Sequence, residues 1–159
     1  MFFNKDNFLR TFKDLPDIIE TYVKNIPENY FDIKRTDDSW TIREHLYHIV
    51  NAQEMLYQRI LKIKEEENPV ITPYFPENES ENNNLYGSID IAFAKYKKIR
   101  EKQIDLINQL VEADYSKEAK HGEYINYNIP IILNHIIFHE YWHMYRVEEI
   151  WLTKNEYFI

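Results

Sequence analysis

Apolar residues recur at every third or fourth position in four stretches of the chain, and this period predicts four helices. With their capping residues, the stretches cover residues 8–26, 41–67, 88–111 and 128–153. Residues 68–88 separate the second stretch from the third and show no such period. The pattern predicts an all-α fold, an up-down-type four-helix bundle with one long connection between helices two and three.

Residue types at the helix ends agree with these boundaries. Thr41 and Glu44 have the spacing of a capping box at the start of the second helix. Ser88 and Asn128 can cap the third and fourth helices through their side-chain oxygens. Pro16, inside the first stretch, lacks a backbone N–H and should kink or divide that helix.

The long connection, residues 68–88, contains three prolines and a tract rich in Asn, Glu and Ser. Structureless loops of this length in a small domain are either functional or disordered. Tyr74 and Phe75 lie between prolines and could close the mouth of a pocket. Two interpretations therefore stay open, a lid and a disordered segment.

Composition narrows the class of protein. The chain has 159 residues, 44% of them hydrophobic, which suits a single domain over residues 1–159. Two glycines are few for the repeated tight turns of an all-β fold. A net charge of −8 argues against a nucleic acid and against an anionic membrane surface as partner. We therefore expect a small-molecule substrate.

Cysteine and targeting segments are both missing from the sequence. Without cysteine, a metal site needs histidine or carboxylate ligands, and any thiol nucleophile must come from outside the chain. The first fifteen residues lack the basic start and unbroken apolar run of a signal peptide, and no long uncharged apolar segment follows. These patterns predict a soluble, cytoplasmic protein.

The fourth helix has apolar residues on more than one side. Those outside the row of histidines are Ile137, Phe138, Tyr141, Trp142 and Tyr145. A surface helix with a single core-facing stripe does not show this pattern. The helix is therefore either central in the bundle or packed on a second subunit, and we favour a homodimer.

The same helix carries the strongest candidate for a metal site. His139 and His143 are four residues apart and lie one above the other on one face. A bundle can complete such a pair with a ligand from a facing helix. The second helix offers His48, in the middle of its apolar row, and His45, one turn earlier. His48 is preferred and His45 is the alternative, while core histidines without a metal are the third possibility.

Residues 139–143, His-Glu-Tyr-Trp-His, also match a zinc-protease pattern in which the glutamate is a general base. Only sixteen residues follow the motif and none is histidine, which disfavours a protease. A di-iron bundle needs paired Glu-x-x-His motifs, and Glu140-x-x-His143 is the only one in the predicted helices. Glu140 stays a secondary catalytic candidate, although its angle of ~100° from His139 could place it on the bundle surface. Arg146, the other secondary candidate, could bind a substrate anion or pair with Glu149.

Two segments carry a family resemblance: residues 39–52, SWTIREHLYHIVNA, and residues 135–143, HIIFHEYWH. They are similar to the Trp-Ser-x-x-Glu-x-x-x-His-Leu-x-x-Ala and His-x-x-x-His-Glu-x-x-His segments of the DinB/YfiT-like four-helix proteins, a family assigned mostly as divalent-metal enzymes. Helix order, long connection and length also agree, so the resemblance covers essentially the whole chain. By position, the family's three metal ligands fall on His48, His139 and His143. The Gly-Gln that usually follows the family's last histidine is absent here.

The resemblance implies a mononuclear divalent-metal site. Some relatives in the family transfer low-molecular-weight thiols to electrophiles, and others isomerise substrates with the help of a thiol. The reactive group would be a metal-bound water or thiol, which places the protein among transferases or hydrolases. Ni, Zn, Fe, Mn and Co all accept imidazole, so the ion is not specified. The alternative is a non-catalytic helical binding or stress-response protein with a structural or vestigial site.

His121, in the connection before the fourth helix, is considered for the mouth of the site. It lies beside Gly122, in a segment without helical periodicity. An exposed loop histidine is usually inert, and the sequence favours that interpretation.

Overall fold

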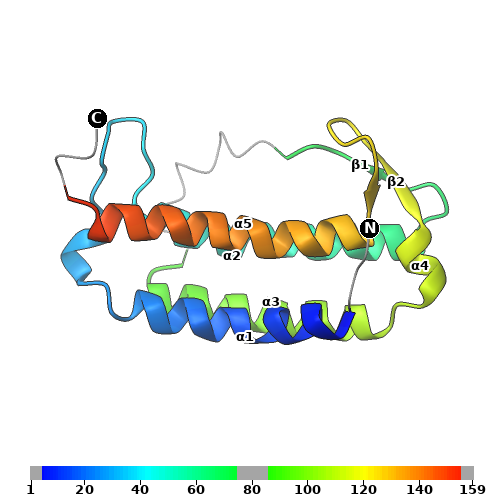
Figure 1. Cartoon of the computed structure of the whole chain (residues 1–159), viewed down its shortest axis with the longest axis horizontal. Helices are drawn as coiled ribbons and strands as arrows, with labels where there is room; N and C mark the ends of the chain where they lie inside the picture. The colour runs from blue at the N-terminus through cyan, green and yellow to red at the C-terminus, as the bar shows by residue number, and fades with distance from the viewer. Residues whose placement is uncertain (1–4, 75–85, 155–159) are drawn as a thin grey trace.

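Four long helices form the fold, as the hydrophobic period predicts. The computed structural model describes residues 5–74 and 86–154. Its long helices are α1 (Lys5–Val23), α2 (Ile42–Glu65), α3 (Ile89–Asn108) and α5 (Ile129–Leu152). Figure 1 shows them in two layers, with α2 beside α5 in one layer and α1 beside α3 in the other. The all-α bundle with a long connection after the second helix is confirmed.

Contacts between side chains fix the directions of the helices. The ring centroids of Tyr47 and Tyr86, near the starts of α2 and α3, are 5.0 Å apart. Further along both helices, Arg100 donates a hydrogen bond to Gln53. Thus α2 and α3 run in the same direction. Figure 1 shows α5 running opposite to α2, and α1 opposite to α3.

Short elements connect the long helices. They are η1 (Glu28–Tyr30), β1 (Val70–Ile71), α4 (Glu112–Ser116), β2 (Glu118–His121) and β3 (Tyr127–Asn128). β1 pairs in parallel with β2, and β2 pairs antiparallel with β3. The hydrophobic pattern does not predict these strands, because strands of two to four residues are too short to show an alternating pattern.

The predicted caps at the starts of α2, α3 and α5 are confirmed. The Thr41 hydroxyl accepts the Glu44 N–H at 3.1 Å, and the Glu44 carboxylate accepts the Thr41 N–H at 2.6 Å, which completes the capping box of α2. The side chains of Ser88 and Asn128 cap α3 and α5. These ends fix where each helix begins, and hence which face of α2 and of α5 carries the histidines.

Of the two effects expected of Pro16, a kink and a division of the first helix, the division does not occur, because α1 is continuous. A proline lacks the N–H that would bond to the carbonyl four residues earlier. That carbonyl belongs to Phe12, and it accepts a hydrogen bond of 3.0 Å from the guanidinium of Arg100 on α3. A neighbouring helix thus satisfies the acceptor that the proline leaves without a partner in its own helix.

The outer face of α5 is aromatic. Its exposed rings are Phe138, Tyr141, Trp142 and Tyr145. They are the basis of the predicted homodimer, which stays a prediction that light scattering in solution would test. Although α5 is apolar, no helix in the described part of the chain combines the length and apolar character that a membrane crossing requires.

Candidate metal centre

Three histidines from two facing helices converge on one point. His48 comes from α2, and His139 and His143 come from one face of α5. The Nε2 atom of His139 lies 2.9 Å from Nε2 of His48 and 3.1 Å from Nε2 of His143. Within the described residues, no other group of three His, Asp or Glu side chains brings its donor atoms close enough together to hold an ion.

His45, the alternative to His48, takes a different position. Its Nδ1 lies 2.8 Å from Nδ1 of His143, so one of these nitrogens donates a hydrogen and the other accepts it. We assign His143 as the donor, because this tautomer leaves the lone pair on its Nε2, the atom that faces His139. His45 therefore orients the His143 ring and is not one of the three converging side chains.

Coordination of a metal ion explains the close approach of the three Nε2 atoms better than hydrogen bonds among the imidazoles do. A neutral imidazole has one N–H, and in this tautomer the hydrogen of His143 is already donated to His45. Metal–imidazole bonds of ~2.0–2.1 Å hold neighbouring ligand nitrogens ~3.0–3.4 Å apart. The observed separations of 2.9 and 3.1 Å lie close to that range. The donor set thus fits a divalent ion of the kind that accepts imidazole.

Burial keeps the imidazoles of His45, His139 and His143 neutral. It lowers the pKa of His139 to about 3 and the pKa of His143 further still, and the neighbouring imidazoles act in the same direction. Burial also lowers the pKa of His45 to about 4, with Arg146 contributing. Neutral imidazoles present lone pairs, so the cluster suits a cation at neutral pH.

The metal-free protein should lose stability as the pH falls below ~6.5, the pKa of histidine in an unfolded chain. His45 and His139 have folded-state pKa values of about 4 and about 3, so between pH 6.5 and these values the unfolded chain binds more protons. Protonation therefore favours unfolding, by at most ~1.4 kcal/mol per pH unit for each group, and the effect is absent above pH 6.5. Denaturant unfolding of chelator-treated protein at several pH values measures this slope, which His45→Gln should reduce. An unchanged free energy of unfolding between pH 7.5 and 5 would contradict the prediction.

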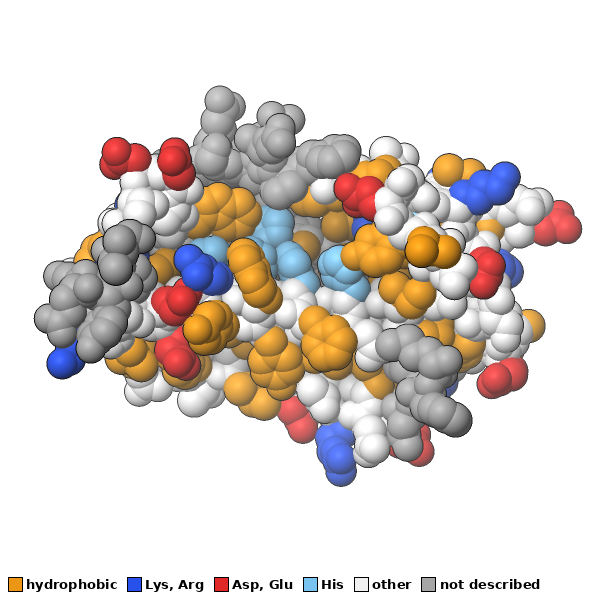
Figure 2. Space-filling model, turned by 45° about the horizontal axis from the view of Figure 1, so that its top comes forward, with side chains coloured by type: hydrophobic (Ala, Val, Ile, Leu, Met, Phe, Trp, Pro, Cys, Tyr) orange, Lys and Arg blue, Asp and Glu red, His pale blue; other side chains and the backbone are white. Residues whose placement is uncertain are grey.

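Two cavities are each lined by at least two of the three histidines. The larger, of about 500 Å³, is lined by Trp40 and Arg146 among others, and the smaller, of about 200 Å³, reaches Arg59. His48 and His139 line both. Figure 2 shows histidine side chains in a hollow bordered by hydrophobic side chains. A further hollow, of about 610 Å³, lies where α1 ends and α3 begins and has no histidine in its wall.

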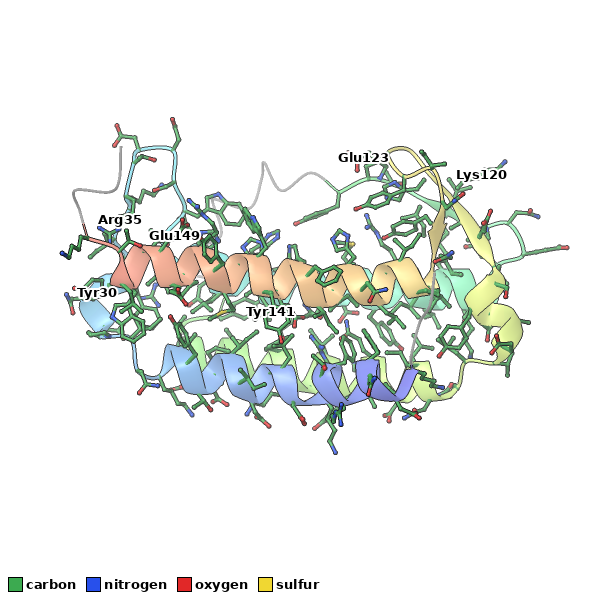
Figure 3. All side chains as sticks on the ribbon, viewed as in Figure 1. Tyr30, Arg35, Lys120, Glu123, Tyr141 and Glu149 are labelled. Atoms are coloured by element: carbon green, nitrogen blue, oxygen red, sulfur yellow. The ribbon has the colours of Figure 1, made fainter. Side chains whose placement is uncertain are left out.

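The two cavities lie along α5 on either side of the centre. Figure 3 places Arg35 and Glu149, which line the larger cavity, near the C-terminal end of α5. It places Glu123, which lines the smaller cavity, at the loop that joins β2 to β3. The three histidines therefore separate two spaces that could each receive a reactant.

Trp40 forms an aromatic wall of the larger cavity. Its ring centroid is 5.0 Å from that of His48 and 5.8 Å from that of His143, on which it stacks with 15° between the planes. This role of Trp40 is not predicted from the sequence. The sequence did contain one indication of this role. Trp40 directly precedes the Thr41 cap, so it lies beside the first turn of α2, which carries His45.

Glu140 lies in the core rather than in either cavity. Its side chain is fully buried, forms an ion pair with Arg100 of α3, and lines neither cavity at the centre. The surface position considered from the sequence was therefore wrong. Successive residues of a helix are ~100° apart, so when His139 faces α2, Glu140 faces α3. This position away from both cavities does not support a role as general base.

Two interpretations of Arg146 are considered from the sequence, an ion pair with Glu149 and a contact with a substrate anion. It forms an ion pair with Glu149, one turn later on α5, and it also lines the larger cavity. The guanidinium is partly exposed, so the pair is held loosely. A role toward a substrate anion stays a prediction.

The smaller cavity contains residues from the connections. His121 and Tyr74 line it together with His135 of α5. The Nδ1 atom of His121 accepts the N–H of Glu123 at 3.0 Å, and the Tyr74 ring centroid lies 6.5 Å from that of His48. Phe75, the other residue of the predicted lid, lies outside the described residues.

Fold and site together define a four-helix-bundle protein with a candidate three-histidine metal centre. Residues 11–154 match the DinB superfamily, and the chain belongs to this superfamily. A protein of Bacillus mycoides (strain KBAB4) named "Putative metal-dependent hydrolase" is 25% identical over 118 residues, which are 74% of this chain and 68% of that protein. A protein of the same name from Bacillus cereus (strain 03BB102) is 24% identical over the same shares.

A solved structure shows the same fold. It is described as "YfiT from Bacillus subtilis is a probable metal-dependent hydrolase with an unusual four-helix bundle topology". The TM-score is 0.82 at 19% identity, and the match covers 92% of this chain and 85% of that chain. The family resemblance predicted from residues 39–52 and 135–143 is thus confirmed.

Proposed function

We propose that the protein is a metal-dependent enzyme in which His48, His139 and His143 hold one divalent ion. The convergence of three Nε2 atoms, with separations of 2.9 and 3.1 Å around His139, carries this proposal. The names of the related Bacillus proteins support metal dependence. A divalent ion on three uncharged ligands would lower the pKa of a water or a thiol at the site toward neutrality.

The reaction that we propose is transfer of a low-molecular-weight thiol to a small electrophile. Two cavities that share His48 and His139 support a reaction between two separately bound reactants. In the transfer, the thiol gives its proton to solvent, a carbon–sulfur bond forms and the bond to the leaving group breaks. Hydrolysis, with water in place of the thiol, is the second candidate, and the names of the relatives favour it.

The chain's own residues would position the reactants. Trp40 and Trp142 give the larger cavity aromatic walls, which exclude water and accept an apolar group. His45 holds the ring of His143 through the 2.8 Å contact between their Nδ1 atoms. Arg146 could leave Glu149 to meet an anionic group, since both side chains line the larger cavity.

The test compares thiol transfer with hydrolysis in zinc-loaded and nickel-loaded protein. We expect cysteine and 1-chloro-2,4-dinitrobenzene to form the thioether faster than without enzyme, and we expect chelation or His139→Ala to abolish the increase. Cleavage of p-nitrophenyl acetate without thioether formation would favour the hydrolase. If neither reaction occurs in protein that holds one equivalent of metal, the non-catalytic binding protein becomes the better interpretation.

A further inference from the structure

The smaller cavity contains an arginine without a carboxylate partner among the described residues. Arg59 of α2 donates from Nη1 to the Tyr127 hydroxyl and from Nη2 to the Thr72 carbonyl, both at 2.9 Å. A guanidinium has five N–H groups, so three remain for another acceptor. Three of the five other arginines, Arg43, Arg100 and Arg146, form ion pairs with acidic side chains. The chain has a net charge of −8, yet no carboxylate among the described residues pairs with Arg59. The cavity therefore suits an anionic ligand.

Arg59 and the metal centre open onto the same space. His48, Ala52, Met55 and Arg59 are spaced by three or four residues, so they follow one face of α2 over about three turns. All four line the smaller cavity, as does His139. The methyl side chain of Ala52 leaves room between the ends of this row. A volume of about 200 Å³ suits a small acid rather than a large ligand.

The guanidinium of Arg59 is held in place before any ligand arrives. Tyr127 belongs to β3 and is fully buried, and Thr72 directly follows β1. The small sheet thus fixes both acceptors, and the Arg59 guanidinium also lies 5.8 Å from the centre of the Tyr127 ring. A donor group that is already oriented loses less conformational entropy when it binds.

We propose that Arg59 binds a carboxylate of one of the two reactants and holds that reactant with its other end at the three histidines. The inference rests on the proposed function, because it assigns the smaller cavity to a reactant. A guanidinium binds a planar carboxylate through two parallel N–H donors. Glu123, exposed at the rim, opposes an anion without pairing with Arg59, so Glu123→Gln should tighten binding two- to threefold.

The test uses a small acid and its neutral analogue. Propionate is titrated into metal-free protein and followed by NMR, with propionamide as the uncharged control and methyl phosphate as the alternative oxyanion. We expect propionate, and not propionamide, to shift signals of the smaller cavity, and methyl phosphate to bind more weakly. Arg59→Gln should weaken propionate binding at least tenfold, Arg59→Lys less, and Arg10→Gln, on the exposed face of α1, should leave it unchanged.

A second variant separates the guanidinium's role in binding from its role in folding. Ala52→Leu fills the cavity while keeping Arg59 and both of its hydrogen bonds, and it should also abolish propionate binding. Propionate binding that survives both Arg59→Gln and Ala52→Leu, or that is absent in the wild type, would overturn the inference. Metal content is measured in parallel. Metal binding without propionate binding rejects only this inference, and propionate binding without metal binding rejects only the proposed function.

Discussion

Replacing His139 with alanine is expected to remove the bound metal. Its Nε2 is the atom that contacts both of the other two Nε2 atoms, at 2.9 and 3.1 Å. Loss of a partner that only orients a ligand weakens metal binding ~10–100-fold, so loss of a direct ligand should cost at least ~100-fold. Competition with a chromophoric chelator measures the dissociation constant, and mass spectrometry measures metal per chain. His48→Ala and His143→Ala should behave in the same way.

Two variants serve as controls for this loss. His45→Gln keeps the three converging nitrogens and removes the contact to Nδ1 of His143. It should therefore lower the affinity for the metal by no more than ~10–100-fold. His121→Ala removes an imidazole from the smaller cavity and should leave the metal unchanged. Far-ultraviolet circular dichroism shows whether each variant keeps its helices. Wild-type affinity in folded His139→Ala protein would mean that the metal binds elsewhere.

The choice between His48 and His45 as third ligand shows what the sequence can and cannot predict about the site. Helical spacing alone places His139 and His143 on one face and puts both His45 and His48 near the apolar row of α2. The position of His48 in the middle of that row favours it, and the family resemblance agrees. Only the packing of α2 against α5 shows that His45 meets the Nδ1 side of His143. Which nitrogen of an imidazole faces a partner is a tertiary property that residue spacing does not contain.

Sequence reasoning misplaced Glu140 and missed Arg59 for the same physical reason. The interaction of a charged side chain depends on what lies across the interface. Glu140 pairs with Arg100, forty residues away on α3, and Arg59 contacts backbone and phenol groups of segments next to β1 and in β3. Periodicity identifies the faces of the helices and their caps, but not these partners.

The ion pair between Arg100 and Glu140 should have the largest effect on stability. Both side chains are almost completely buried, between two clusters of apolar core residues. Burial raises the pKa of Glu140, and the Arg100 charge opposes this rise. Gln53 and Tyr96 also accept from Nη2 of Arg100, the nitrogen that pairs with Glu140. Removing one partner leaves a buried charge without compensation, so Arg100→Met or Glu140→Gln should cost ~3–5 kcal/mol in the free energy of unfolding.

A double replacement distinguishes an unpaired charge from lost packing. Arg100→Met with Glu140→Leu removes both charges, and it should be much less destabilising than the sum of the single changes. The surface pair on α5 supplies the matched control: Arg146→Met or Glu149→Leu should change the free energy of unfolding by less than ~1 kcal/mol. Denaturant unfolding at pH 7.5 gives each value. If the effects of Arg100→Met and Glu140→Leu on the free energy of unfolding simply add, then the two residues do not stabilise the protein through their ion pair.

Pro16 links this ion pair to the first helix. The Phe12 carbonyl has no helical donor, because residue 16 is proline, and it depends on the 3.0 Å hydrogen bond from Arg100. In Arg100→Met protein that carbonyl is buried without a partner, at a cost of ~1–3 kcal/mol. Pro16→Ala restores an N–H four residues after Phe12, so it should recover part of the stability lost in Arg100→Met. The same change in the wild type creates a second donor for an acceptor already satisfied, and the gain there should be smaller. Equal effects of Pro16→Ala in both backgrounds would show that Arg100 and α1 are not coupled through this carbonyl.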